Sequence, residues 1–228
     1  MPNIYSTGGD GWAMTGAESS WVNARRSAGV SSDNNNSRDS MAVLVEYLAG
    51  KGGGLQVVMR RAFMSFNTSG ISVAPSEATL KVRGYANQTA DVIVVKSTAA
   101  TTVVAGSFDD IPNTATPFGA TDGSGAGTLA GVSGLTYSAE IATWSVSGYV
   151  DIELNSTALD DMASLDTFKI CIMEYDSDYL DITPSLNSFV KIGFYWAENT
   201  GTSLDPYIDY TAGVASVAHN APFFGTNF

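Results

Sequence analysis

Residues 55–66 read LQVVMRRAFMSF, a run without proline or glycine that follows the turn sequence KGGG at residues 51–54. In an extended chain, successive side chains point to opposite faces. Both alternate sets are largely apolar here: Val57, Met59, Arg61 and Phe63 share one side, and Val58, Arg60, Ala62, Met64 and Phe66 share the other. The run therefore predicts a central β-strand that is covered on both faces.

Runs on either side of this stretch have the same extended character. Residues 149–154 (YVDIEL) alternate between polar or aromatic and aliphatic side chains, which is typical of a strand with one buried face. The predicted strands are residues 41–48, 55–66, 78–85, 91–97, 149–154, 168–175, 189–197 and 206–210. The sequence NQTA at residues 87–90 predicts a hairpin between the third and fourth of these strands.

Helical signals are few. Residues 17–27 allow a short helix, and Asn155 or Ser156 can cap another over residues 157–163. Strands that outnumber helices in this way predict an all-β fold. We expect an antiparallel β-sandwich of jelly-roll type with one short helix.

The chain is expected to form a single domain over residues 1–210, with an irregular N-terminal segment over residues 1–40. Residues 211–228 do not continue the strand pattern and form a C-terminal tail with three aromatic rings: Phe223, Phe224 and Phe228. Exposed rings on a tail are costly in a monomer. The tail therefore either folds back over its own core or docks on a neighbouring subunit or particle.

Charge limits the classes of partner. Charged residues make up 15% of the 228 residues, against about 25% in ordinary soluble domains. Acidic residues outnumber basic ones 23 to 11, which gives a net charge of −12. Binding to phosphates needs a basic surface, so nucleic acid is not an expected partner.

No membrane or secretion signal is recognisable. The most apolar stretch, residues 41–49, contains Glu46 and falls far short of the about 20 residues that cross a bilayer. The opening MPNIYS has neither the basic nor the apolar region of a signal peptide. We expect no membrane partner, and synthesis in the cytoplasm of a host without a secretion address.

Catalytic groups are sparse. The single cysteine, Cys171, lies in the apolar run KICIM and is expected to be a buried core residue. A serine-type triad would depend on His219, the only histidine, which lies in the tail. Paired carboxylates for glycoside hydrolysis stay open, either Asp151 with Glu153 or Glu174 with Asp176. Acids on a solvated face explain them without catalysis, and we expect no enzyme.

Two other groups of residues suggest ligands. Hard oxygen ligands at alternating positions suit Ca²⁺, and a candidate set consists of Glu174, Asp176, Asp178 and Asp181. A solvated acidic turn is the alternative interpretation, and no other cofactor is expected. Trp12 and Trp144 lie in loop-like surroundings and are candidates for stacking on a glycan, with packing in a core or an interface as the alternative.

Five segments, taken in order, resemble a known family: SSWVNAR at residues 19–25, RRAFMSFNTSGI at 60–71, PSEATLKV at 75–82, GYVDI at 148–152 and DPYIDY at 205–210. They resemble the disaggregatase-related, carbohydrate-binding-like jelly-roll domain, which begins with a Trp/Arg segment and ends in a Pro-Tyr strand. The acidic, Gly/Ser/Thr-rich form without a signal peptide is similar to virion structural proteins of tailed bacteriophages, particularly marine ones.

This resemblance implies a non-enzymatic bacteriophage virion protein, a capsid decoration or cement protein or a head-fibre subunit. A tail-fibre or receptor-binding carbohydrate-binding module is the alternative. The expected partners are other capsid or tail proteins, and a surface glycan stays open. We also expect a homo-oligomer, with a trimer as the first expectation, located in the virion. No catalytic residue is carried over from the family.

Overall fold

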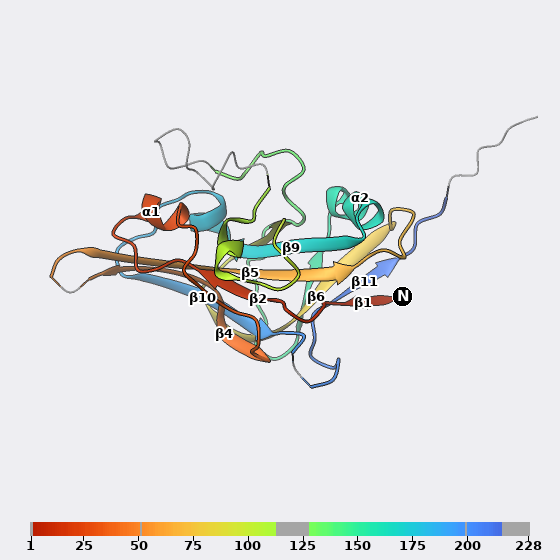
Figure 1. The fold of residues 1–228 in the computed structure, drawn as a ribbon, viewed down its shortest axis with the longest axis horizontal. Coiled ribbons are helices and arrows are strands. Elements are labelled where there is room, and N and C mark those ends of the chain that lie inside the picture. Colours follow the sequence, from red (N-terminus) through yellow and green to blue (C-terminus); the bar gives the residue numbers. More distant parts are fainter. Residues whose placement is uncertain (1, 51, 113–127, 199, 216–228) are drawn as a thin grey trace, which may run out of the picture.

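The structure is a computed structural model that describes residues 2–50, 52–112, 128–198 and 200–215. It is an antiparallel β-sandwich, as the sequence predicts (Figure 1). Its strands are β1 (Asn3–Tyr5), β2 (Gly11–Met14), β3 (Ser31–Asp33), β4 (Arg38–Ala49), β5 (Leu55–Asn67), β6 (Glu77–Gln88), β7 (Val92–Lys96), β8 (Tyr149–Glu153), β9 (Thr167–Glu174), β10 (Ser188–Tyr195) and β11 (Tyr207–Thr211). The helices are α1 (Trp21–Arg25) and α2 (Ser156–Ser164), with single helical turns η1 (Ala105–Asp109) and η2 (Tyr175–Tyr179).

The sheet folds over into two layers. In the first layer, β11 and β8 lie on either side of the first part of β6, and β1 pairs with β11. The last part of β6 pairs with β10, which in turn pairs with β4. The second layer has the order β3-β2-β5-β9-β7. The layers separate along β5, because β4 pairs with its first half up to Arg60 and β9 pairs with its second half from Ala62 onward. The long β4–β5 hairpin therefore joins the two layers.

The main core lies between the layers. The second half of β5 contributes Ala62, Met64 and Phe66 to it, and β6 and β8 contribute their own alternate residues, such as Leu80 and Ile152. All of these side chains are buried, because in each strand every second residue points toward the facing layer. This core accounts for the period-2 pattern of β6 and β8.

The central strand β5 is covered on its other face as well, as predicted. Met59 and Phe63 belong to a second apolar cluster with Cys171 of β9. This cluster is covered by α1, η1, η2 and the loops that lie over β5 and β9 in Figure 1. Burial of Cys171 confirms its expected place in the core.

Three details correct the sequence-based expectations. The hairpin predicted at residues 87–90 is wrong: β6 pairs with β8, β10 and β11, whereas β7 pairs with β9 in the other layer. The chain crosses between layers there, and Thr89 takes the left-handed backbone conformation (φ 50°). The described residues form two α-helices rather than one short helix. The N-terminal segment contains three short strands and α1, because β2 pairs with β5 and buries Ala13.

The ends of the predicted elements are close to those observed. Asn155 caps α2, where its side chain accepts a hydrogen bond from the amide of Ala158 (3.1 Å). At the C-terminal end, β11 extends through Thr211, whose carbonyl accepts a hydrogen bond from the amide of Ser76 (3.0 Å). The tail therefore begins after the last strand rather than within it. Neither helix in the described ranges combines the length and the apolar character of a transmembrane span.

Candidate docking site

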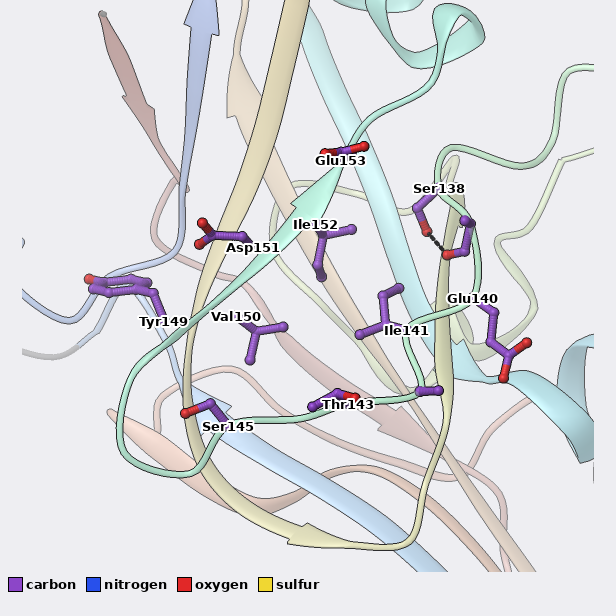
Figure 2. Close-up of a pocket in the computed structure, with 12 residues that line it drawn as sticks. Ser138, Glu140, Ile141, Thr143, Ser145, Tyr149, Val150, Asp151, Ile152 and Glu153 are labelled. Atoms are coloured by element: carbon purple, nitrogen blue, oxygen red, sulfur yellow. Dashed lines mark hydrogen bonds between the residues drawn. The ribbon is translucent and has the colours of Figure 1, made fainter.

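A groove lies between β8 and the chain that precedes it (Figure 2). Residues 138–145 and β8 form the two arms of a splayed hairpin around a cavity of about 490 Å³. The arms meet at one end, where the amide of Asn155 donates to the carbonyl of Tyr137 (2.9 Å). Before this meeting point, the arm at residues 138–145 turns away from β8, because Ile141 exchanges both main-chain hydrogen bonds with Val92 of β7. The space between the arms is therefore open to solvent.

A close approach to β6 fixes the turn at the other end of the groove. The amide of Gly84 donates to the carbonyl of Gly148 (3.1 Å). A Cβ atom at Gly84 would lie 1.7 Å from the carbonyl oxygen of Ser145, so only glycine allows this turn to sit against β6. The hydroxyl of Ser145 accepts hydrogen bonds from the amides of Ser147 (3.4 Å) and Gly148 (3.1 Å).

The free edge of β8 faces the groove. Among the described strands, β8 pairs with β6 alone. The amide of Leu154 donates to the carbonyl of Ala78, and in an antiparallel pair alternate residues direct their main-chain groups to the same neighbour. Tyr149, Asp151 and Glu153 therefore direct N–H and C=O groups away from β6, along the groove.

Side chains give the groove an apolar floor and an acidic rim. Ile141, Val150 and Ile152 point into the space between the arms in Figure 2. The rim carries exposed carboxylates: Glu140 on one arm, and Asp151 and Glu153 on the other. As the sequence alternation predicted, Asp151 and Glu153 lie on the same outer side of their strand. Asp151 is paired with Lys81 of β6 at 2.6 Å.

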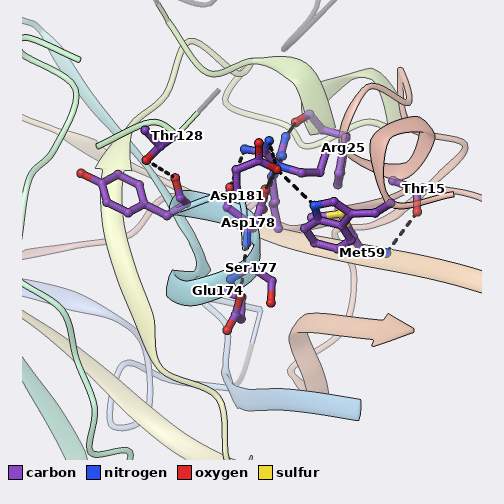
Figure 3. A network of polar contacts seen from close by, with 12 residues as sticks. Thr15, Arg25, Met59, Thr128, Glu174, Ser177, Asp178 and Asp181 are labelled. Carbon is purple, nitrogen blue, oxygen red and sulfur yellow. Dashed lines mark hydrogen bonds and ion pairs between the residues drawn. The ribbon is translucent and has the colours of Figure 1, made fainter. Parts of the chain in front are cut away.

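The acidic cluster proposed for calcium has a different arrangement (Figure 3). Asp178 binds Arg61 through both carboxylate oxygens, each at 2.7 Å, and both side chains are buried. Arg25 donates to the main-chain carbonyl of Asp178 (2.8 Å) and pairs with Asp181 (2.6 Å), which also accepts from the indole of Trp21 (3.1 Å). Two of the four predicted ligands thus neutralise arginine side chains.

The other two members of the cluster do not join them. Glu174 is buried and accepts hydrogen bonds from the amides of Ser177 (2.6 Å) and Asp178 (3.2 Å), which caps η2. Burial raises the pKa of Glu174 to about 7, because it disfavours the charged form. Asp176 is exposed. In the part of the chain that the structure describes, no three carboxylate, histidine or cysteine side chains gather into a group able to hold a metal.

This polar network fastens η2 and the covering loops to the back of β5. Arg61 donates to the carbonyl of Phe108 in η1 (2.6 Å), and its guanidinium lies 4.0 Å from the centre of the Phe108 ring. A bidentate arginine–carboxylate pair fixes both distance and orientation. The sequence places Asp178 in a candidate metal cluster, but only the structure shows that Arg61 is its partner across the fold.

Trp12 and Trp144, the candidates for stacking on a glycan, pack in the core, which is the alternative interpretation of both residues. Trp12 lies in β2 with 8% of its surface exposed, and its indole donates to Asp39 (2.7 Å). Trp144 is 6% exposed and donates to the carbonyl of Gly193 (3.3 Å). A ring so covered offers no face on which a sugar can stack. Phe223, Phe224, Phe228 and His219 lie outside the described residues.

Sequence reasoning missed the groove, although it identified one of its walls. The alternation of residues 149–154 indicated an exposed acidic face on β8. The opposing arm, residues 138–145, carries no periodic signal, since only Ile141 pairs with a strand. No protein-family model matches the chain, and no curated protein matches it either.

Proposed function

We propose that the chain is a non-enzymatic structural subunit of a bacteriophage virion, a capsid decoration or cement protein or a head-fibre subunit. The observation that carries this proposal is the groove at the free edge of β8. A free strand edge on a rigid sandwich is suited to attachment, because its main-chain groups are available to another chain. The resemblance of the sequence to tailed-phage virion proteins supports the particle as the place of attachment.

The chemistry of the polar groups favours a structural role over turnover. Among the ion pairs of the described residues, Arg61 with Asp178 is the most buried, and it ties loops to the central strand. Asp151, one of the candidate catalytic acids, is paired with Lys81. If the chain hydrolysed a polysaccharide through this pair, Asp151→Asn and Glu153→Gln would abolish reducing-end release. We expect no release from the wild-type chain.

A carbohydrate-binding module is the second candidate, favoured by a row of tyrosines on the neighbouring strands β1, β11 and β8. The ring centres of Tyr5 and Tyr207 lie 5.5 Å apart, and those of Tyr207 and Tyr149 lie 5.3 Å apart. Partly exposed aromatic rings on a sheet offer faces for sugar rings. On a glycan array, binding that Tyr207→Ala removes and Trp144→Phe retains would support this candidate.

The particle role is tested by locating the chain. Antibody labelling and cryo-electron microscopy of purified particles from the phage that encodes it should place ordered copies on the capsid. Particles that form normally without the chain, and never carry it, would contradict the proposal. Copies on the tail alone would support the tail-fibre alternative.

The tail supplies the second contact in this proposal, either between copies of the chain or with the particle. Truncation after Ala215 keeps Thr211 and therefore all of β11. We expect the truncated chain to fold with an unchanged melting temperature and to lose its oligomeric state, the first expectation being a trimer that becomes a monomer. Analytical ultracentrifugation of both chains measures this change. An unchanged oligomer with unchanged particle incorporation would refute the tail contact.

A further inference from the structure

Resting on the docking function proposed above, we propose that the β8 groove binds an extended segment of another protein in which apolar residues alternate with lysine or arginine. The segment would add to β8 as a further strand. Its main chain would pair with the outward N–H and C=O groups of Tyr149, Asp151 and Glu153. β8 has five residues and spans about 17 Å at about 3.4 Å per residue, so five or six residues of the partner suffice.

The two faces of the added strand determine the alternation. Side chains that lie beside Asp151 and Glu153 emerge on the outer face, where both carboxylates are exposed. Directly opposite residues in an antiparallel pair have Cβ atoms about 4.5–5.5 Å apart, which is close enough for a lysine or arginine to form an ion pair. The side chains in between point inward, toward Val150 and Ile152. Within that floor Ile141 is partly exposed, while Val150 and Ile152 are 7% and 2% exposed, so side chains placed against it leave water and aliphatic residues are favoured.

Charge decides between a foreign segment and a second copy of this chain. Pairing two β8 strands about a two-fold axis at Asp151 would place the two Asp151 carboxylates opposite each other. Like charges directly opposite are destabilising, and the chain as a whole carries −12. A cationic segment instead gains from Glu140 and Glu153 on opposite rims. The acidic rim thus disfavours self-pairing and favours a basic partner.

A defined peptide tests this assignment with the full chain. The probe is a fluorescent, capped heptapeptide of four lysines alternating with three valines. A matched control has the same composition with its lysines and valines in separate blocks, and a second control replaces each lysine with glutamate. We expect the alternating peptide to bind at least about tenfold more tightly than either control, measured by fluorescence anisotropy at low salt.

Main-chain pairing between the peptide and β8 can be measured separately from the affinity. In amide hydrogen exchange followed by NMR, saturating alternating peptide should slow the exchange of the Tyr149, Asp151 and Glu153 amides at least about tenfold. Tyr149→Pro removes one outward N–H at the first residue of an edge strand, where proline is tolerated, and leaves the rim carboxylates in place. It should weaken binding at least about tenfold without changing the melting temperature by more than a few degrees.

Two charge-reversal variants distinguish attraction by the rim carboxylates from attraction by the net charge of the whole chain. Glu153→Lys changes the rim, and Asp166→Lys makes the same change at an exposed site away from the groove. We expect Glu153→Lys to weaken the alternating peptide about tenfold and Asp166→Lys to leave it within about twofold. Equal binding of the alternating and block peptides, or equal effects of the two variants, would overturn the assignment.

The outcomes also separate this assignment from the particle role. Ordered copies on particles without peptide protection of the three β8 amides would overturn the basic-segment partner and leave the particle role standing. If the peptide protects these amides but the chain never joins particles, the particle role would be overturned and the basic-segment partner would stand. A dimer of the chain alone that protects the same amides would overturn the assignment in favour of a second copy.

Discussion

Behind β5, the carboxylates of Asp178 and Asp181 lie against Arg61 and Arg25, whereas along β8 those of Glu140 and Glu153 are exposed to solvent. Both regions combine acids with an apolar surface, and in the sequence both are simply acidic segments. They differ in burial: arginines from distant parts of the chain enclose the first group of acids, whereas the second group, in which Lys81 pairs with Asp151, lies at the surface. The acids behind β5 are neutralised inside the fold, whereas the carboxylates of Glu140 and Glu153 face the solvent.

This difference indicates that the first group of acids stabilises the fold and that the second is available to bind another molecule. A buried carboxylate without a partner costs several kcal/mol, so Asp178 depends on Arg61 to keep η2 on the sheet. An exposed carboxylate costs the fold almost nothing, so Glu140 and Glu153 can serve contacts with another molecule. The free energy of unfolding is therefore the quantity in which the two regions should differ.

Removing one partner of the buried pair should have the largest effect. Arg61→Ala removes both side-chain hydrogen bonds to the buried Asp178 carboxylate and leaves Arg25, 3.9 Å away, as its remaining ion-pair partner among the described residues. The expected loss in the free energy of unfolding is about 3–5 kcal/mol. Urea denaturation followed by tryptophan fluorescence measures it. Replacing both partners with apolar residues, Arg61→Met with Asp178→Leu, should recover part of the loss. A loss below about 1 kcal/mol for Arg61→Ala would mean that the network does not hold the covering loops.

The buried acids should make stability depend on pH in an unusual direction. Burial raises the pKa of Glu174 from 4.5 to about 7 and that of Asp109 from 3.8 to about 6. The folded chain therefore keeps these protons at pH values where the unfolded chain has lost them. The free energy of unfolding should fall as the pH rises from 4.5 to about 7.

Glu174 alone should contribute about 3 kcal/mol to that change, since one pKa unit corresponds to about 1.4 kcal/mol, and Asp109 adds to it in the same direction. Asp10 contributes in the same direction, because burial and the nearby Glu198 raise its pKa. Glu174→Gln keeps an oxygen acceptor for the η2 amides and should flatten the profile. Denaturation series at several pH values compare the two chains, and parallel profiles would contradict the assignment of this dependence to Glu174.

The surface pair at the rim should contribute least. Lys81 and Asp151 lie 2.6 Å apart, but the Asp151 side chain is 59% exposed. Lys81→Ala should change the free energy of unfolding by about 0.2–1 kcal/mol. The same denaturation assay measures it beside Arg61→Ala. Equal losses for the two variants would remove the contrast between the two regions.

Particular residues show how much of this contrast the sequence could reveal. Alternation predicted the strands because every second residue faces a core, and the double-sided run at residues 55–66 correctly indicated a strand covered on both faces. The hairpin at residues 87–90 failed because local turn signals do not state which layer the next strand joins. Register among strands distant in sequence is set by the whole fold.

The candidate site was less predictable for the same reason. Asp178 and Arg61 are 117 positions apart, so no spacing rule connects them. Trp144 looked like a loop residue because its neighbours are polar and small, yet its ring packs on Phe194, with ring centres 5.9 Å apart. The groove depends on Gly84, whose missing Cβ admits the Ser145 turn. Such a contact between distant residues leaves no local pattern in the sequence.

Amide hydrogen exchange of the free chain measures whether the outer edge of β8 is unpaired and therefore available for docking. The amides of Val150 and Ile152 face β6 and should exchange slowly, whereas those of Tyr149, Asp151 and Glu153 should exchange at least about a hundredfold faster. Slow exchange at all five positions in the chain without peptide would show that another part of the protein already covers this edge, so that no partner strand could dock there.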